Sequence, residues 1–290
     1  MELHEALAHA KAHANDRPAT EGRLGGKIAI VTGAAQGFGL GIAQCMYAEG
    51  ASVVIADLNL PLAEQTAAEM GERAIAIQVN VADEESVCQL MCKTVEAFGG
   101  IDIVVANAGV AKAGSLDEME PNTFNFVTNI NYLGYFLCAK YASKIMKAQL
   151  EAAPDKFFDI IQVNSKSGLE GSKNNFAYAG SKFGGIGLTQ SFAMELAPFN
   201  IKVNSICPGN YYDGPLWSDP ERGLFVQYLR AGKVPGAKTV EDVKNFYLSK
   251  SLIKRGCFPS DVAKAIMYCV EQCYETGQAI PVTGGQVMLN

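Results

Sequence analysis

A hydroxyl, a phenol and an amine that could carry out acid–base chemistry lie between residues 165 and 182. Tyr178 follows Ser165 by thirteen residues, and Lys182 follows Tyr178 by four in a segment with a helical pattern. Residues four apart on a helix share one face, so the Lys182 ammonium is expected near the Tyr178 phenol. A phenol has an ordinary pKa of about 10, and a nearby cation lowers that pKa because it favours the phenolate. With Ser165 bound to a substrate oxygen, this set predicts proton transfer to or from an alcohol or carbonyl.

A Tyr and a Lys at this spacing are more often a surface pair, so their meaning depends on a hydride acceptor elsewhere. Gly33, Gly37 and Gly39 follow the apolar run 28–32 and precede an amphipathic helix that extends to about Glu49. Glycine in such a turn lets backbone amides approach a pyrophosphate at the helix N-terminus. The spacing is G-x-x-x-G-x-G instead of the common G-x-G-x-x-G, so the match is in position and mechanism. The turn predicts a dinucleotide site.

Asp57 ends the second predicted strand and indicates which dinucleotide binds. A carboxylate at this point accepts hydrogen bonds from the adenosine ribose hydroxyls. No Lys or Arg occurs between Lys27 and Arg73, so no nearby cation is available for the 2′-phosphate of NADP. Unless a lysine from elsewhere in the fold reaches this point, the sequence predicts NAD as the cofactor.

Short apolar runs and amphipathic helices alternate after residue 26. The predicted strands are 28–32, 51–56, 74–79, 102–106, 157–164, 201–206 and 278–283, and the later predicted helices are 60–70, 83–98, 121–150, 177–197 and 260–273. Continuously apolar strands that alternate with helices indicate a parallel sheet covered on both faces. We therefore predict one α/β domain over residues 26–290, a doubly wound, Rossmann-like sheet of about seven strands.

Residues 1–25 are a predicted Ala-rich helical arm closed by Asn15-Asp16-Arg17-Pro18. Either a frayed arm or a strap over a neighbouring subunit fits this pattern. All three histidines lie in this arm, so a Ser-His-Asp hydrolase or a His-ligated zinc enzyme would have to recruit its histidine from there. His9 and His13 could share a helix face, but a solvated surface is the simpler interpretation, and no metal site is predicted.

Composition excludes several classes of protein. No apolar run reaches the roughly 18 residues of a membrane span, and a net charge of −6 argues against nucleic-acid binding. The N-terminus is acidic and lacks a compact apolar core, so it does not resemble a signal peptide. Eight cysteines occur without a Cys-x-x-Cys, and the pairs 88/92 and 269/273 have the spacing of buried helix faces. Free thiols in the cytoplasm are therefore expected.

These motifs, in their order along residues 27–290, resemble the short-chain dehydrogenase/reductase family. The resemblance implies that Tyr178 is the acid–base group, Lys182 lowers its pKa and binds the nicotinamide ribose, Ser165 holds the substrate oxygen and Asn131 positions a relay water. The implied cofactor-binding residues are Gly33, Gln36, Gly37, Phe38, Gly39, Asp57, Leu58, Asn80, Val81, Asn107, Ala108, Gly109, Tyr178, Lys182, Pro208, Gly209 and Asn210. The family often has Thr soon after Pro-Gly to bind the carboxamide, whereas this chain continues with Asn210-Tyr211-Tyr212-Asp213.

Within the family, residues 164–191, 252–257 and 276–288 resemble most the members that act on polyols, sugar phosphates or deoxysugar-derived hydroxyaldehydes. Lys166, Lys173 and Trp217 are the candidate substrate residues, although two solvated lysines and a packed tryptophan explain them about as well. The resemblance implies that residues 210–255 cover the bound substrate. A ketoacyl-thioester reductase and an NAD-binding sensor are the alternatives. The resemblance also implies a tetramer or dimer built on the helices at 121–150 and 177–197.

Overall fold

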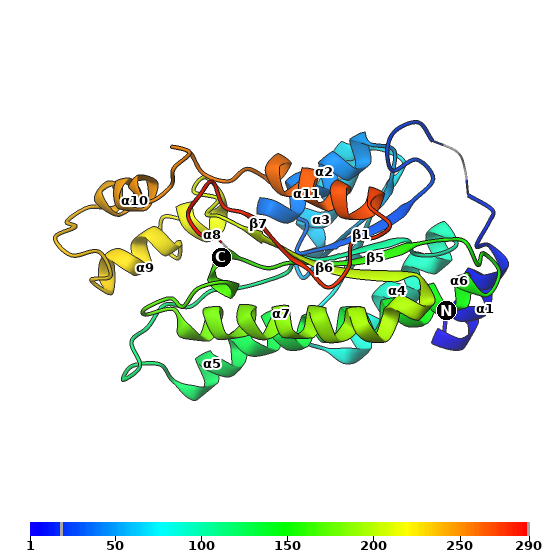
Figure 1. Ribbon diagram of the computed structural model, residues 1–290, viewed down its shortest axis with the longest axis horizontal. Helices are drawn as coiled ribbons and strands as arrows, with labels where there is room; N and C mark the ends of the chain where they lie inside the picture. The colour runs from blue at the N-terminus through cyan, green and yellow to red at the C-terminus, as the bar shows by residue number, and fades with distance from the viewer. Residues whose placement is uncertain (18–19, 289–290) are drawn as a thin grey trace.

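The computed structural model describes residues 1–17 and 20–288, and its centre is one parallel sheet (Figure 1). The strand order is β3-β2-β1-β4-β5-β6-β7, so the predicted doubly wound sheet of seven strands is confirmed. The strands are β1 (Ile28–Thr32), β2 (Ser52–Asp57), β3 (Ala74–Gln78), β4 (Ile103–Ala106), β5 (Phe158–Val163), β6 (Ile201–Pro208) and β7 (Ala279–Val282). Every residue of β1, β4, β5 and β6 is buried, as expected of strands covered on both faces.

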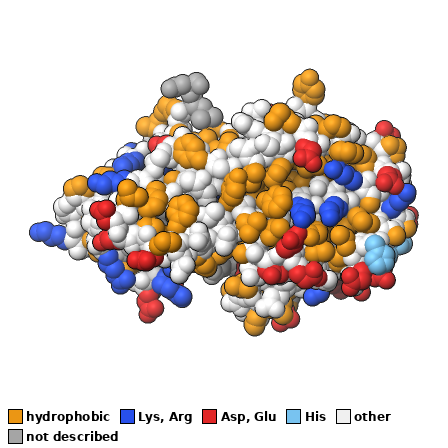
Figure 2. Space-filling view, turned by 90° about the horizontal axis from the view of Figure 1, so that it is seen from below, with side chains coloured by type: hydrophobic (Ala, Val, Ile, Leu, Met, Phe, Trp, Pro, Cys, Tyr) orange, Lys and Arg blue, Asp and Glu red, His pale blue; other side chains and the backbone are white. Residues whose placement is uncertain are grey.

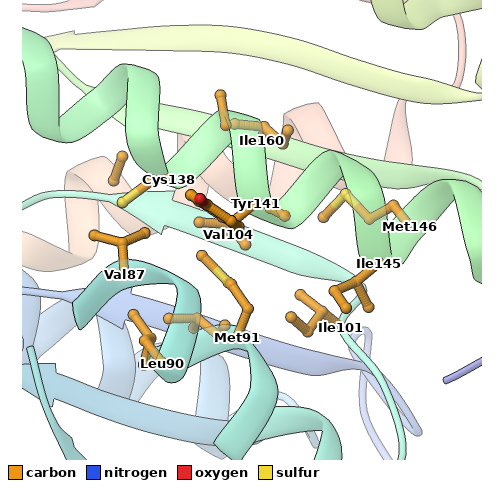
Figure 3. Packing of buried hydrophobic residues seen from close by; sticks show 14 of the residues in the cluster. Val87, Leu90, Met91, Ile101, Val104, Cys138, Tyr141, Ile145, Met146 and Ile160 are labelled. Carbon is orange, nitrogen blue, oxygen red and sulfur yellow. The ribbon is translucent and has the colours of Figure 1, made fainter. Parts of the chain in front are cut away.

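Helices cover both faces of the sheet and enclose two hydrophobic cores. One core lies under α2 (Gly37–Ala48), α3 (Leu60–Met70) and α11 (Pro259–Glu271). The other lies under α4 (Glu84–Phe98), α6 (Gly134–Leu150) and α7 (Phe176–Leu196). Figure 3 shows the second core, where Val87, Leu90 and Met91 of α4 meet Cys138, Ile145 and Met146 of α6 over the sheet. None of the helices within residues 1–17 and 20–288 is long and apolar enough to cross a membrane.

The predicted helix at 121–150 is interrupted, which corrects the sequence prediction. α5 covers Pro121–Thr128, a π-helical segment covers Asn129–Leu133, and only then does α6 begin. Gly134 lies so close to the loop after β3 that an added Cβ would be 3.0 Å from Val81 Cγ2. π-Helical turns are rare and concentrate at functional sites. This one contains Asn131.

The predicted pairing of Cys269 and Cys273 on one buried helix face is also wrong. α11 ends at Glu271, so Cys269 is buried and Cys273 is exposed beyond the helix. The buried ammonium of Lys202 donates to the carbonyl oxygens of Cys269, Val270 and Gln272 at the helix end. A cation that takes the last carbonyls in this way terminates the helix favourably.

The N-terminal helix α1 (Leu3–Ala12) lies against its own domain. Ala6 and Ala10 are fully buried in the core that also contains α4 and α6. The helix is thus neither a frayed arm nor, over these residues, a strap extended away from the chain. Pro18, part of the predicted closing signal, lies outside the described residues.

Residues 210–255 form a separate lobe at one end of the molecule (Figure 1). Its helices are α8 (Pro215–Ser218), α9 (Leu224–Arg230) and α10 (Val240–Ser249). Trp217 is the centre of their packing, with ring centroids 5.0 to 5.7 Å from those of Phe225, Tyr247, Tyr212 and Tyr228. An aromatic core of this kind gives the lobe its own packed interior.

Candidate active site

A cavity of about 1080 Å³ lies at the carboxyl ends of the strands, between the sheet and the lobe. Gly33 follows β1, Asp57 ends β2, Asn107 follows β4 and Pro208 ends β6, and all four line this cavity. Open α/β sheets bind their ligands at this edge. The fold therefore brings together loops that are far apart in the sequence.

Ser165, Tyr178 and Lys182 converge on one wall of the cavity. Ser165 follows β5 and starts a short 3₁₀ turn, where its Oγ accepts a hydrogen bond from the Ser167 amide at 3.1 Å. Tyr178 and Lys182 lie in the first two turns of α7, and Lys182 Nζ is 5.6 Å from the centre of the Tyr178 ring. The sequence prediction that these three side chains share one site agrees with this placement.

The electrostatics of the trio differ from the prediction. Lys182 is buried, and its Nζ donates to the Val163 carbonyl at 2.9 Å instead of to the phenol. Burial raises the pKa of Tyr178, and hydrogen bonding with Ser165 offsets part of this rise. Burial also lowers the pKa of Lys182 to about 8. The direction of the phenol pKa is therefore opposite to the expected lowering in this geometry, because burial of the phenol is its largest cause and Lys182 donates to Val163.

Asn131 supports the site from behind. Its Oδ1 accepts from the Val110 amide at 2.8 Å, and its Nδ2 donates to the Val110 carbonyl at 2.9 Å and to Ser181 Oγ at 3.1 Å. It lines a small void next to Lys182 and does not line the large cavity. The side chain fixes the backbone after β4, and a part in a proton relay stays a prediction.

The glycine turn fits a dinucleotide. Gly33 and Gly37 both have φ of +64°, a conformation that favours glycine. A Cβ on Gly39 would lie 2.2 Å from the Gly33 carbonyl oxygen and 2.5 Å from Asn107 Nδ2, so only glycine fits there. α2 begins at Gly37 without a side-chain cap from Gln36, and both residues line the cavity. Uncapped amides at a helix N-terminus are suited to a pyrophosphate.

Asn107 connects this turn to β4. Its Nδ2 donates to the carbonyls of Thr32 at 2.8 Å and Gly33 at 3.1 Å, while its amide donates to Thr32 Oγ1 at 3.0 Å. These bonds hold the glycine turn beside the loop that follows β4. All the predicted cofactor residues line the cavity except Gly39, whose position is inside the turn.

Asp57 lines the cavity, and both of its carboxylate oxygens accept hydrogen bonds from nearby backbone amides. Oδ2 accepts from the Ala35 amide and Oδ1 from the Asn59 amide, each at 3.0 Å. Arg73, the next cation in the sequence, is committed elsewhere, since its guanidinium donates to the carbonyls of Ala51 and Tyr47 and covers the Tyr47 ring. Those residues lie at the opposite end of β2, so Arg73 is not available to a group at Asp57.

The candidate substrate residues differ in their surroundings. Lys166 lines the cavity but forms an ion pair of 2.8 Å with Glu170. Lys173 lines the cavity and is exposed. Trp217 borders the cavity from within the aromatic core of the lobe. Sequence reasoning missed Lys233 and Lys250, which line the cavity from the lobe, because no local pattern predicts how α9 and α10 fold over it.

The segment after Pro208-Gly209 is the beginning of the lobe. Tyr212, which stands near the position where the family often has Thr, is buried, and its hydroxyl accepts from Asn210 Nδ2 at 3.1 Å and Gln286 Nε2 at 3.2 Å. Asp213 is exposed. Asn210, one of the predicted cofactor-binding residues, lines the cavity.

The sheet, the glycine turn and the Ser-Tyr-Lys wall define a short-chain dehydrogenase. The family model described as short chain dehydrogenase matches residues 27–217, and the chain belongs to this family. It is therefore an oxidoreductase that acts on CH–OH groups with a nicotinamide cofactor.

The chain is also similar to individual members of the family. The chain is 37% identical over 271 residues to sorbitol-6-phosphate 2-dehydrogenase from Escherichia coli K12, covering 90% of this chain and 99% of the relative. The crystal structure of sorbitol-6-phosphate 2-dehydrogenase from Erwinia amylovora matches with a TM-score of 0.82 and 37% identity, over 90% and 100% of the two chains. A 3-ketoacyl-(acyl-carrier-protein) reductase from Brucella melitensis, complexed with NADH, matches with a TM-score of 0.78 and 27% identity, over 91% and 99%.

Proposed function

We propose that this protein moves a hydride between a secondary alcohol or ketone of a polyol or sugar phosphate and NAD. The observation that carries the proposal is the convergence of Ser165, Tyr178 and Lys182 on one wall of a cavity that also contains the glycine turn. The similarity to sorbitol-6-phosphate 2-dehydrogenases supports the substrate class. The reacting centre would then be one carbon of the substrate, placed between the Tyr178 phenol and the cofactor site.

The chain's own residues supply proton transfer and orientation. Bound NAD supplies the hydride acceptor. In oxidation, the Ser165 hydroxyl holds the substrate oxygen and the Tyr178 phenolate takes the hydroxyl proton, while the hydrogen on the carbinol carbon leaves with its bonding electrons as the hydride that NAD would accept. In reduction, the neutral phenol, which burial favours by raising the pKa of Tyr178, protonates the carbonyl oxygen. The buried ammonium of Lys182, which donates to the Val163 carbonyl and lies 5.6 Å from the centre of the Tyr178 ring, favours the phenolate that this proton transfer leaves.

The cofactor preference is proposed from Asp57. Replacing Asp57 with alanine is expected to weaken NADH binding by about tenfold to a hundredfold, the range for hydrogen bonds to a charged group. NADPH binding should not weaken, because removal of the carboxylate also removes its repulsion of the 2′-phosphate. Fluorescence titration of both reduced cofactors measures this, with the exposed Asp213→Ala as the matched control. Tighter binding of NADPH than of NADH by the unaltered protein would contradict the proposal.

A substrate panel separates the proposed function from its alternatives. NADH formation is measured with phosphorylated polyols, free polyols and deoxysugar-derived hydroxyaldehydes, and NADH consumption with a ketoacyl thioester. We expect the fastest turnover with a polyol or its phosphate. Dominant activity on the thioester would favour the reductase alternative. Binding of NADH would not by itself distinguish the two functions, because a ketoacyl reductase among the relatives is also complexed with NADH. Tight NADH binding without turnover of any substrate would favour the sensor.

A homo-oligomer is proposed from the outer face of α7. Phe183, Gly187, Gln190 and Met194 recur at helical spacing on its exposed side, and Met194 is 75% exposed. Figure 2, which views the molecule from the side of α5 and α7, shows hydrophobic side chains across the middle of this face. Helix faces of this kind commonly mark protein–protein contacts.

Sedimentation of the purified protein tests the homo-oligomer. We expect a mass that is a multiple of 31.0 kDa and a shift towards the monomer on Phe183→Asp, since a charge at a packed interface is costly. Leu116→Asp, at a residue 81% exposed outside α7, is the matched control and should not change the mass. An unaltered protein that sediments as a monomer would refute the proposal.

A further inference from the structure

Lys233 is a half-buried lysine in the lobe that the chemistry at Tyr178 does not use. Its Nζ lies 4.0 Å from the centre of the Tyr228 ring and donates to Ser172 Oγ at 3.2 Å. Lys250, at the end of α10, lies with its Nζ 4.3 Å from the centre of the Phe246 ring. Within residues 1–17 and 20–288, no carboxylate lies within 4.0 Å of either ammonium. Both lysines line the cavity.

The charged groups near Lys233 are cations. The charged groups that act on it are Lys166, from the loop after β5, and Lys250, and both are cations. The phenol of Tyr228, which lies against it from α9, has a pKa raised by burial and is neutral. Burial and the two like charges lower the pKa of Lys233 to about 8. Lysines gathered in a partly desolvated place repel one another unless an anion joins them.

The acidic residues of the cavity do not supply that anion. Of the charged residues that line it, seven are basic and three are acidic. Glu170 pairs with Lys166, and Asp219 accepts from the amides of Glu221 and Arg222. Asp57 lies at the far loop, after β2. The lobe side of the cavity therefore carries an excess of positive charge that a ligand would balance.

Lys233 is connected to the reacting end through one aromatic ring. Asn175 precedes the first turn of α7, three residues before Tyr178, and its Nδ2 donates to the Tyr228 hydroxyl at 3.2 Å. The Tyr228 ring in turn carries Lys233 on its face. A substrate whose alcohol carbon lies at Tyr178 can thus extend along this wall and place its far end at Lys233.

We propose that Lys233 and Lys250, with the Ser172 hydroxyl, form an anion subsite that binds the phosphate group of a phosphorylated polyol while its secondary alcohol lies at Tyr178. The inference rests on the proposed function for the position of the alcohol. Lysine binds phosphate as a point charge, and two cations without carboxylate partners match the double charge of a phosphate monoester better than the single charge of a carboxylate. The hydroxy group of an uncharged polyol would leave both cations unbalanced.

Protection of Lys233 from acylation tests the subsite without any turnover. The full-length protein with NADH is treated with trace acetic anhydride at pH 8, and acetylation of each lysine is followed by peptide mass spectrometry. Inorganic phosphate and sorbitol 6-phosphate are expected to slow the acetylation of Lys233 at least about threefold, whereas sorbitol is not. Lys238, an exposed lysine of the same lobe outside the cavity, is the internal control. Equal acetylation of Lys233 with and without both phosphates overturns the subsite, whatever the enzyme oxidises.

Kinetics then assign the subsite to the substrate. Lys233→Met is expected to lower kcat/KM for sorbitol 6-phosphate by about tenfold to a hundredfold, the range for a lost bond to a charged group, and to leave free sorbitol nearly unchanged. Lys233→Arg should retain most of the preference, and Lys238→Met should retain all of it. An equal effect of Lys233→Met on both substrates, or a stronger effect on a hydroxy acid, would overturn the phosphate assignment.

The pH dependence gives an independent readout. The ratio of kcat/KM for sorbitol 6-phosphate to that for sorbitol is expected to fall as the pH rises through about 8, because the Lys233 ammonium then loses its proton. Titration of Tyr178 affects both substrates and cancels in the ratio. A ratio that is constant from pH 7 to 9.5 contradicts the subsite. Phosphate protection of Lys233 in a protein that oxidises no polyol would instead retain the subsite and refute the proposed function.

Discussion

Replacing Tyr178 with phenylalanine is expected to lower kcat for alcohol oxidation by about a hundredfold to ten-thousandfold, the usual contribution of a positioned acid–base group. The change removes only the hydroxyl and keeps the ring, which lines the cavity together with Lys182. NADH affinity should fall far less than kcat, because the ring and the rest of the cavity wall stay in place. Initial rates of NADH formation and fluorescence titration of NADH measure the two effects separately.

The control for this variant is Tyr274→Phe, which removes the hydroxyl of a tyrosine that is 99% exposed. It should retain full activity. A second comparison uses pH. Because burial raises the pKa of Tyr178, the rate of oxidation should rise with pH in the unaltered protein, as the phenol gives way to the phenolate. Full turnover by Tyr178→Phe on the preferred substrate would show that another group transfers the proton.

Replacing Asp102 with asparagine is expected to reduce the free energy of unfolding by about 3–5 kcal/mol, the cost of leaving buried charges without their partner. Asp102 is fully buried at the start of β4 and pairs with Arg17 at 2.8 Å and Lys156 at 2.7 Å. Its Oδ2 also accepts from the Ile28 amide at 2.8 Å. One carboxylate thus connects the N-terminal segment, β1 and the approach to β5.

Urea denaturation followed by circular dichroism measures this loss. Asp155→Asn, at an exposed carboxylate next to Lys156, is the matched control and should change the unfolding free energy by less than about 0.5 kcal/mol. Adding Arg17→Met to Asp102→Asn should recover part of the stability, because one stranded charge is then removed. Unchanged stability of Asp102→Asn would mean that water or local rearrangement satisfies both cations.

The parts of the site that the sequence predicted are those set by neighbouring residues. The glycine turn lies between β1 and α2, so its position follows directly from the order of elements. Tyr178 and Lys182 share a helix face by their spacing alone. Asp57 was predicted because it ends a strand of a parallel sheet, and all such ends meet at one edge.

The parts that the sequence did not predict depend on tertiary contacts. The π-helical segment around Asn131 is associated with the close approach of Gly134 to Val81, which no local pattern reveals. The raised pKa of Tyr178 depends on the burial of the phenol in the folded chain. Lys233 reaches the cavity only because the lobe packs around Trp217. Burial and the folding of the lobe therefore had to come from the structure.

Transfer of the substrate's own hydrogen to NAD⁺ is the most direct test of a reaction between an alcohol at Tyr178 and a cofactor at the glycine turn. Sorbitol 6-phosphate that carries deuterium at C2 is incubated with NAD⁺ and the full-length protein, and the NADH formed is examined by mass spectrometry. We expect one deuterium in each NADH, formed at a rate that Tyr178→Phe lowers by at least about a hundredfold. NADH without deuterium, or no NADH at all from this substrate, would contradict the proposed reaction.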